Sequence, residues 1–290
     1  MHVLTRERSA FGRLLDIESK LVRWTGNLTD RPAVERCLRG AEPEVIFHLA
    51  GNTSGRHFQG DWASVEPAIA DNFVATLSLL RAAAESGVAI RSVIRTGGLE
   101  EYGGGATPYV EAQREQPRSP YSASQVAATH WCQMLQPSLP FAVVTLRPAL
   151  IYGPAQSADF LIPALIASLL RGKRFHLTDG TQARDLLYVD DFVRAMLLAA
   201  GADASALRGA ILNISTGQEY LIRDVARRVA SALAAESLLD VGTHPTRAGE
   251  LVHLVAANAE AKCRLGWQPE VDLDEGLQRT IAWYRAEHSA

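Results

Sequence analysis

Residues 45–51 read V-I-F-H-L-A-G, a short and mostly apolar run that ends in two small residues. Such a run is typical of a strand that is buried on both faces between layers of helices. Similar runs recur along the chain, and amphipathic stretches with helical spacing separate them. The expected strands are His2–Thr5, Lys20–Trp24, Val45–Leu49, Ser92–Arg95, Ala142–Arg147 and Ile211–Ile214, and the expected helices are Arg31–Arg39, Val65–Ser86, Tyr121–Leu135, Phe160–Arg171, Val189–Ala200 and Ile222–Ala235.

This alternation predicts an α/β fold with a doubly wound parallel sheet. Ligands of such sheets bind beyond the carboxyl ends of the strands. After residue 215 the pattern changes to one helix, a polar strand-like stretch and a final helix at Leu273–Tyr284, which we interpret as a smaller lobe. The residues expected at the ligand edge are Thr5-Arg6, Gly26-Asn27, Ala50-Gly51, Thr96 to Tyr102, Pro148 to Pro154 and Ser215.

The composition excludes several classes of protein. With 47% hydrophobic and 21% charged residues, the chain has the composition of a folded globule. A net charge of −3 without a basic run gives no electrostatic basis for nucleic-acid binding. No run has the length of a membrane span, and the first residues do not resemble a signal peptide. Cysteines without a C-x-x-C spacing and histidines without metal-ligand spacing predict a cytoplasmic protein with free thiols and no metal.

Five segments in a fixed order resemble a known family. They are F-H-L-A-G at Phe47–Gly51, S-P-Y-S-A-S-Q at Ser119–Gln125, R-P-A-L-I-Y-G-P at Arg147–Pro154, R-D-L-L-Y-V-D-D at Arg184–Asp191, and L-G-W-Q-P at 265–269. Their order and intervals resemble the extended short-chain dehydrogenase/reductases, in particular the NAD-dependent epimerases and 4,6-dehydratases of nucleotide sugars. The resemblance covers essentially the whole chain. It implies a Rossmann-like domain at residues 1–153 and 184–214 and a substrate-binding lobe at residues 154–183 and 215–290.

The family's Tyr-x-x-x-Lys motif falls on Tyr121 and Gln125. In the family the tyrosine exchanges a hydroxyl proton during hydride transfer at the sugar, and the lysine holds the nicotinamide ribose and stabilises the phenolate. A glutamine can hydrogen-bond a ribose hydroxyl but carries no charge. Without a cation, the phenolate costs roughly 4 kcal/mol at pH 7, at about 1.36 kcal/mol per pKa unit. Tyr121 is thus either the acid/base residue or a buried aromatic at a helix start.

The family's catalytic serine or threonine lies four residues before a Tyr-Gly pair. Here that pair is Tyr102-Gly103, so the position is Gly98, which has no hydroxyl. Glu100 stands where the dehydratases carry the glutamate that removes the C5 proton. The alternative is that G-G-L-E-E at 97–101 is an ordinary polar loop.

Two arginines correspond to those that bind the pyrophosphate of the sugar nucleotide in the family, namely Arg184 and Arg247. A guanidinium donates two parallel hydrogen bonds to phosphate oxygens and does not deprotonate. The alternatives are an ion pair with Asp185 or another neighbour for Arg184, and a solvated loop charge for Arg247.

The glycine-rich fingerprint of dinucleotide binding occurs nowhere in the 290 residues. Because His2–Arg6 resembles the family's second strand, we expect the family's first strand, glycine loop and helix, roughly thirty residues, to be missing before Met1. His2–Thr5 and Val45–Leu49 should then pair directly or each form an exposed edge. The alternative is that the gene begins upstream of Met1 or that the chain was cut, which translation of the upstream DNA would test.

Of the other positions that the resemblance implies for cofactor binding, some match the family's residues and others differ. Asn72 matches a family asparagine, and Asn27 stands where the family has an aspartate that reads adenine. Ala50, Gly51 and Pro148 follow strand ends. Arg6 stands where the family has an acidic residue that hydrogen-bonds the ribose. An arginine at this position favours NADP over NAD if either binds.

The resemblance therefore implies an NAD(P)-dependent nucleotide-sugar epimerase or dehydratase that is impaired in cofactor binding and catalysis. The rival is a non-catalytic homologue that binds a sugar nucleotide or a partner subunit. Family members commonly dimerise through the two helices at 65–86 and 121–135, so we expect a homodimer. The apolar residues at helical spacing on these helices are Ile69, Phe73, Leu77, Leu80, Val126, Trp131 and Leu135.

Overall fold

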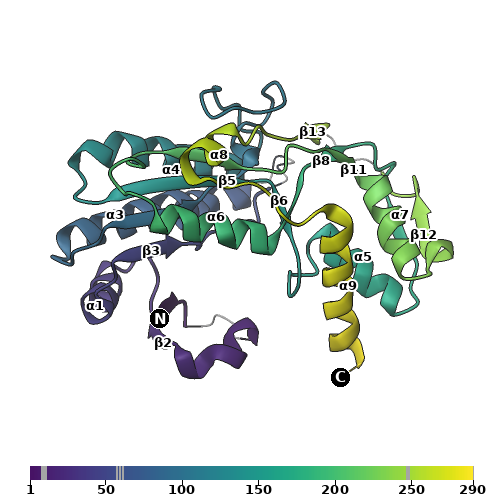
Figure 1. Ribbon diagram of the computed structural model, residues 1–290, viewed down its shortest axis with the longest axis horizontal. Coiled ribbons are helices and arrows are strands. Elements are labelled where there is room, and N and C mark those ends of the chain that lie inside the picture. The colour runs from purple at the N-terminus through teal and green to yellow at the C-terminus, as the bar shows by residue number, and fades with distance from the viewer. Residues whose placement is uncertain (8–11, 57, 59, 61, 246–248, 290) are drawn as a thin grey trace. The chain divides into compact units, whose positions relative to one another are not determined.

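A computed structural model describes residues 1–7, 12–56, 58, 60, 62–245 and 249–289 (Figure 1). The chain forms two compact units, and each has its own hydrophobic core. The first unit comprises Met1–Glu101, Glu115–Leu146 and Ala199–Ile211, and the second comprises Tyr102–Arg114, Arg147–Leu198 and Leu212–Ala290.

Strands and helices alternate along the chain, as expected. Up to residue 148 the elements are β1 (His2–Thr5), the 3-10 helix η1 (Gly12–Lys20), β2 (Val22–Thr25), α1 (Arg31–Ala41), β3 (Val45–His48), η2 (Trp62–Ser64), α2 (Val65–Ala68), the π-helix η3 (Ile69–Val74), α3 (Ala75–Glu85), β4 (Ser92–Thr96), η4 (Leu99–Glu101), α4 (Pro120–Leu135), η5 (Gln136–Ser138) and β5 (Ala142–Pro148). From residue 150 they are β6 (Leu150–Tyr152), α5 (Leu161–Leu170), β7 (Phe175–Leu177), β8 (Ala183–Arg184), β9 (Leu186–Tyr188), α6 (Val189–Gly201), β10 (Ile211–Ile214), β11 (Tyr220–Leu221), α7 (Ile222–Ala232), η6 (Glu236–Leu238), β12 (Leu239–Val241), β13 (His253–Leu254), α8 (Ala259–Leu265) and α9 (Leu273–Ser289).

The main sheet contains strands β10, β5, β4 and β3 in that order. β3 runs parallel to β4 with Val45 opposite Ser92, and β4 runs parallel to β5 with Ser92 opposite Ala142. All of β5 and most of β4 are buried, and the core of the first unit lies between these strands and helices α1, α3 and α4. The predicted α/β fold with a parallel sheet is therefore confirmed.

β1 and β2 form a second, parallel sheet of two strands, with His2 opposite Val22. Figure 1 shows these strands, in purple, apart from β3. Among the described residues β1 and β3 do not pair, so each lies at the edge of its own sheet, one of the two expected arrangements. Most side chains of β1, β2 and β3 are partly or fully exposed, so the expectation of strands buried on both faces is wrong here. A two-stranded sheet and an edge strand have too few neighbours to cover both faces.

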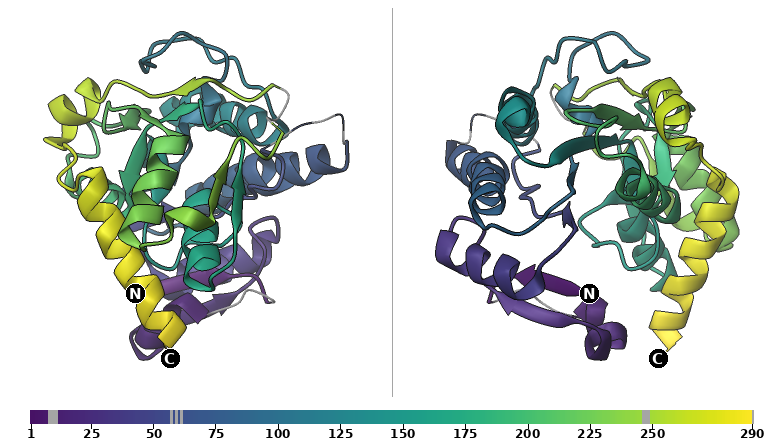
Figure 2. Two further views of the ribbon diagram at one scale, coloured as in Figure 1. Left: turned by 90° about the vertical axis from the view of Figure 1, so that its right-hand side faces the viewer. Right: turned by 60° about the vertical axis from the view of Figure 1, so that its left-hand side comes forward.

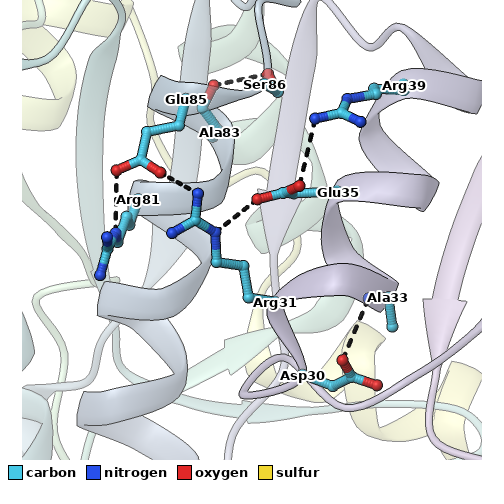
Figure 3. Close-up of polar contacts among 9 residues, drawn as sticks. All are labelled: Asp30, Arg31, Ala33, Glu35, Arg39, Arg81, Ala83, Glu85 and Ser86. Carbon is cyan, nitrogen blue, oxygen red and sulfur yellow. Dashed lines mark hydrogen bonds and ion pairs between the residues drawn. The ribbon is translucent and has the colours of Figure 1, made fainter.

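Helix α1 begins as its sequence predicts. Asp30 Oδ1 accepts a hydrogen bond from the Ala33 backbone N–H at 3.3 Å, and Pro32 lies in the first turn. Glu35 pairs with Arg31 at 2.6 Å and with Arg39 at 3.3 Å. Figure 3 shows that Arg31 also contacts Glu85 of α3, which in turn binds Arg81, so ion pairs link α1 to α3 at the surface.

The predicted helix at Val65–Ser86 contains a change of helix type. α2, η3 and α3 follow one another without a break, and η3 is a π-helix. Within it, Asn72 is buried and accepts a hydrogen bond from the Asn52 backbone N–H at 2.6 Å. π-helical turns inside α-helices are frequent at functional sites. Here the turn places a polar side chain against the loop that follows β3.

The second unit contains short strands and longer helices. β6 pairs with β9, β7 with β12, and β8 with both β11 and β13. The core lies among α5, α7 and α9, and Figure 2 shows the yellow α9 beside the green α7. β6 and β9, both assigned by the sequence to the nucleotide-binding domain, pair with each other and lie in this unit. The boundaries of the predicted domains stay a prediction. No helix in the described part of the chain is long and apolar enough to span a membrane.

Candidate active site

Tyr121 lies in the first turn of α4, and the start of this helix fixes its position. Ser119 Oγ accepts a hydrogen bond from the Ser122 N–H at 3.1 Å, and Ser122 Oγ accepts one from the Ser119 N–H at 3.0 Å. Pro120 suits the first helical position because it needs no partner for an N–H. The Tyr121 N–H donates to the Gly55 carbonyl at 3.2 Å, and its side chain is buried.

Gly98 lies close to this tyrosine. A Cβ at Gly98 would be 3.6 Å from the Tyr121 hydroxyl and only 2.7 Å from Oε2 of Glu100. The carboxylate of Glu100 therefore occupies space that a side chain at position 98 would need. The structure thus brings together three of the four residues predicted at the catalytic site, Tyr121, Gly98 and Glu100, with a carboxylate beside the position from which the family's hydroxyl is absent.

Arg56, in the loop after β3, completes this cluster. Its guanidinium carbon lies 5.1 Å from the centre of the Tyr121 ring, and its Nε lies 4.0 Å from Glu100 Oε1. The side chains of Arg56 and Glu100 are each about three-quarters buried, at 26% and 22% exposure. A phenol, a carboxylate and a guanidinium therefore share one partly desolvated site.

These neighbours act in opposite directions on the pKa of Tyr121. Together they raise it to about 12, with burial as the largest cause and the negative charge of Glu100 as the next. The charge and hydrogen bond of Arg56 lower the pKa, and Glu101 raises it slightly. Phenolate formation at pH 7 would then cost roughly 7 kcal/mol, so Tyr121 is protonated at rest.

Gln125 is buried one turn along α4 and belongs to a polar network. Its Oε1 accepts a hydrogen bond from Arg95 of β4, which also donates to the Gln125 carbonyl at 3.2 Å and to Thr129 Oγ1 at 2.9 Å. Thr129 donates to Glu101 Oε2 at 2.8 Å, and Glu101 Oε1 accepts from the Gly98 N–H at 3.1 Å. The network ties position 125 to the loop that carries Gly98.

Gly51 and Asn72 lie at the carboxyl end of β3, near the amide of Gln125. A Cβ at Gly51 would be 3.2 Å from Asn72 Oδ1 and 3.9 Å from Gln125 Nε2. Because Gln125 Oε1 accepts from Arg95, its amide nitrogen is directed toward this edge of the sheet. Asn72 Nδ2 donates to the Asn52 carbonyl at 3.0 Å and to Ser124 Oγ at 2.9 Å. Asn72 therefore links the loop after β3 to α4 by hydrogen bonds.

The other predicted cofactor residues lie outside this cluster. Arg6, Asn27 and Ala50 are exposed, and Pro148 is buried at the end of β5. Asn27 Oδ1 accepts hydrogen bonds from the backbone N–H and the hydroxyl of Thr29, at 3.1 and 3.0 Å, so it closes a local turn.

The two predicted phosphate-binding arginines belong to the second unit. Arg184 is nearly buried, and its guanidinium donates to Glu250 Oε1 at 3.1 Å and to the Ala183 carbonyl at 2.9 Å. The carboxylate of Asp185 accepts from Ser215, Thr216 and Gly217, and burial raises its pKa. Arg247 lies outside the described residues.

A family model matches residues 1–215, and its description is the NAD dependent epimerase/dehydratase family. The chain belongs to this family. UDP-glucose 4-epimerase of Mycolicibacterium smegmatis is 34% identical over 250 residues, which cover 84% of this chain and 77% of that protein. dTDP-glucose 4,6-dehydratase of Haemophilus influenzae is 26% identical over 281 residues, covering 89% and 81%. The solved structure of MoeE5 in complex with UDP-glucuronic acid and NAD superposes with a TM-score of 0.82 at 29% identity, and the match covers 92% of this chain and 86% of that one.

The described residues of this epimerase/dehydratase homologue match only one end of a nicotinamide dinucleotide. The Tyr121 hydroxyl and the Gln125 amide could meet a ribose. A pyrophosphate needs free N–H groups at a helix N-terminus after a glycine-rich turn. The N-terminus of α1 is instead capped by the carboxylate of Asp30, and that of α4 by Ser119. The described residues therefore fit the dinucleotide incompletely.

Sequence reasoning missed Arg56, Arg95 and Glu101. Arg56 follows the carboxyl end of a strand, where ligand-binding residues are expected, and this position was its one signal. Arg95 interrupts an apolar strand, and a buried arginine needs partners. Glu101 adjoins Glu100, and the sequence alone does not show which of the two carboxylates turns inward.

Proposed function

We propose that this chain is a nucleotide-sugar epimerase/dehydratase homologue that binds nucleotide sugars, but binds NAD(P) weakly and has negligible turnover as a 290-residue chain. The observation that carries the proposal is the cluster around Tyr121. It retains the family's tyrosine, but Gly98 offers no hydroxyl and Gln125 no charge. Losses of this kind typically reduce rates by ~10²-fold or more each.

The relatives support the class of ligand. Two of them are named for UDP-glucose and dTDP-glucose chemistry, and MoeE5 binds UDP-glucuronic acid with NAD. For this chain we propose the same ligand class, a nucleoside diphosphate sugar, with Arg184 and Arg247 contributing phosphate contacts. Arg6 favours NADP over NAD if a dinucleotide binds.

Titration calorimetry with UDP-glucose, dTDP-glucose, NAD and NADP tests the proposal. We expect measurable binding of at least one nucleotide sugar, much weaker binding of both dinucleotides, and no product by chromatography after long incubation. Micromolar NAD(P) affinity or product formation would contradict the proposed impairment of cofactor binding and turnover. Absence of nucleotide-sugar binding would overturn the ligand class.

Two variants test the role of Arg184. Because the carboxylate of Glu250 neutralises the charge of Arg184, Glu250→Gln should strengthen its attraction for phosphate and tighten nucleotide-sugar binding several-fold. Arg184→Gln should weaken binding tenfold or more, since a charge-assisted hydrogen bond contributes about 1.5–3 kcal/mol. Equal affinities for both variants and the wild type would show that Arg184 is only a structural partner of Glu250.

A further inference from the structure

The hydroxyl of Tyr121 has lost the cation that the family supplies from α4. Position 125 carries a neutral amide, and its oxygen already accepts from Arg95. Two carboxylates, Glu100 and Glu101, lie nearby and oppose ionisation of the phenol. A buried phenol that must exchange a proton needs a compensating positive charge within a few ångströms.

Two arginines are candidates for that charge. Arg95 lies on β4 beneath α4, and its guanidinium donates to Gln125 and Thr129. Arg56 approaches from the loop after β3 and lies over the Tyr121 ring, 5.1 Å from its centre. Of the two, Arg56 is the one that contacts the tyrosine.

We propose that Arg56 replaces the missing helix cation and favours the ionised form of the Tyr121 phenol. It is a positioning residue, because it acts through the tyrosine, and its role in catalysis rests on the proposed function. Glu100 has two parts in this arrangement. Its Oε1 lies within ion-pair distance of Arg56 Nε, at 4.0 Å, and its other oxygen lies in the space that Gly98 leaves open.

Gly98 leaves the space that the carboxylate of Glu100 occupies in this arrangement. A serine or threonine there would push Glu100 Oε2 away, since its Cβ would lie 2.7 Å from that oxygen. A hydroxyl-bearing side chain at position 98 would therefore require the carboxylate of Glu100 to shift. The groups that face Tyr121 are Arg56 from the β3 loop and Glu100 and Glu101 from η4.

The test measures the pKa of Tyr121 directly and needs no ligand, so failure of the proposed function would not affect it. A fluorinated tyrosine is placed at position 121, because ring fluorination lowers the phenol pKa into the range where the protein stays folded. Its ¹⁹F chemical shift is followed against pH. Arg56→Gln should raise the pKa by about one unit or more, Arg56→Lys should keep it within a few tenths, and Glu100→Gln should lower it.

Arg81→Gln is the matched control, because Arg81 is an exposed arginine that pairs with Glu85 on α3. It should leave the Tyr121 pKa unchanged. Thermal melts of each variant confirm folding. The proposal is overturned if Arg56→Gln leaves the pKa unchanged or lowers it, or if Arg56→Lys shifts it as far as Arg56→Gln does.

Discussion

Gln125 and Arg95 form a buried pair, so the side chain at position 125 depends on the one at position 95. Arg95 is 2% exposed, and the Gln125 oxygen is one of its acceptors. The family's lysine at this position would place an ammonium beside the guanidinium and remove that acceptor. Buried charges left without compensation typically cost several kcal/mol.

We therefore predict that Gln125→Lys alone lowers the free energy of unfolding by on the order of 3 kcal/mol. Adding Arg95→Met should recover most of this loss, because the competing charge is gone. Gln125→Met, which removes the acceptor without adding a charge, is the control and should cost less. Urea unfolding measures all three, and a Gln125→Lys variant as stable as the wild type would contradict the prediction.

His48 at the end of β3 gives the fold a specific acid sensitivity. Thr76 Oγ1 donates to the Asn72 carbonyl at 2.6 Å, so it accepts from His48 Nε2 at 2.9 Å. Burial and the charge of Arg95 lower the pKa of His48 to about 3. The neutral ring is therefore favoured in the folded state, while the unfolded chain takes up a proton near pH 6.5.

The contribution of His48 to stability is complete above about pH 6.5 and is lost as the pH falls toward 3. His48→Gln keeps a hydrogen-bond donor for Thr76 but cannot take up a proton. We predict that this variant loses roughly 3 kcal/mol less stability than the wild type between pH 6.5 and 4. His130→Gln, at an exposed histidine beside Glu115, should behave like the wild type. The measurement is urea unfolding at a series of pH values. Identical pH profiles for His48→Gln and the wild type would count against the buried neutral ring.

At the scale of elements, β2 and α1 meet at a glycine. A Cβ at Gly26 would lie 2.6 Å from the Cβ of Ala33, so the strand end and the first turn of the helix are in direct contact. We predict that Gly26→Ala lowers the free energy of unfolding by about 1–3 kcal/mol, because backbone must move. Gly12→Ala, where nothing lies within 4 Å, should change it by less than about 0.5 kcal/mol. Ala33→Gly added to Gly26→Ala should recover part of the loss, and its failure to do so would place the strain elsewhere.

The sequence predicted the long elements well and the short ones poorly. The helices and the buried strands β4, β5 and β10 have enough apolar residues to show a period. The two-residue strands β8, β11 and β13 have too few, because tertiary pairing rather than local pattern creates them. The closeness of Tyr121, Gly98 and Glu100 followed from the family's spacing. Arg56 did not, because the direction of a loop side chain depends on packing that no local pattern encodes.

At the scale of the whole molecule, the predicted homodimer has a candidate face. Phe73 of η3 and Trp131 of α4 are in ring contact at 5.9 Å and join the two helices into one surface. The exposed apolar side chains on this η3–α4 face are Ile69, Val74, Trp131 and Met134. Leu80, expected at the interface, is instead buried in the core of the first unit because it faces the sheet. The face is therefore narrower than the sequence suggests and centres on Trp131.

We predict that the protein sediments as a homodimer at micromolar concentration and that Trp131→Glu dissociates it. A tryptophan at the centre of an interface typically contributes about 2 kcal/mol or more, so the dissociation constant should rise at least about thirtyfold. Leu197→Glu is the matched control, since Leu197 of α6 is also an exposed apolar residue, at 59%, but lies on a different helix. Sedimentation equilibrium over a concentration series distinguishes the cases. A monomeric wild type would refute the dimer, and dissociation by Leu197→Glu with an intact Trp131→Glu dimer would move the interface to α6.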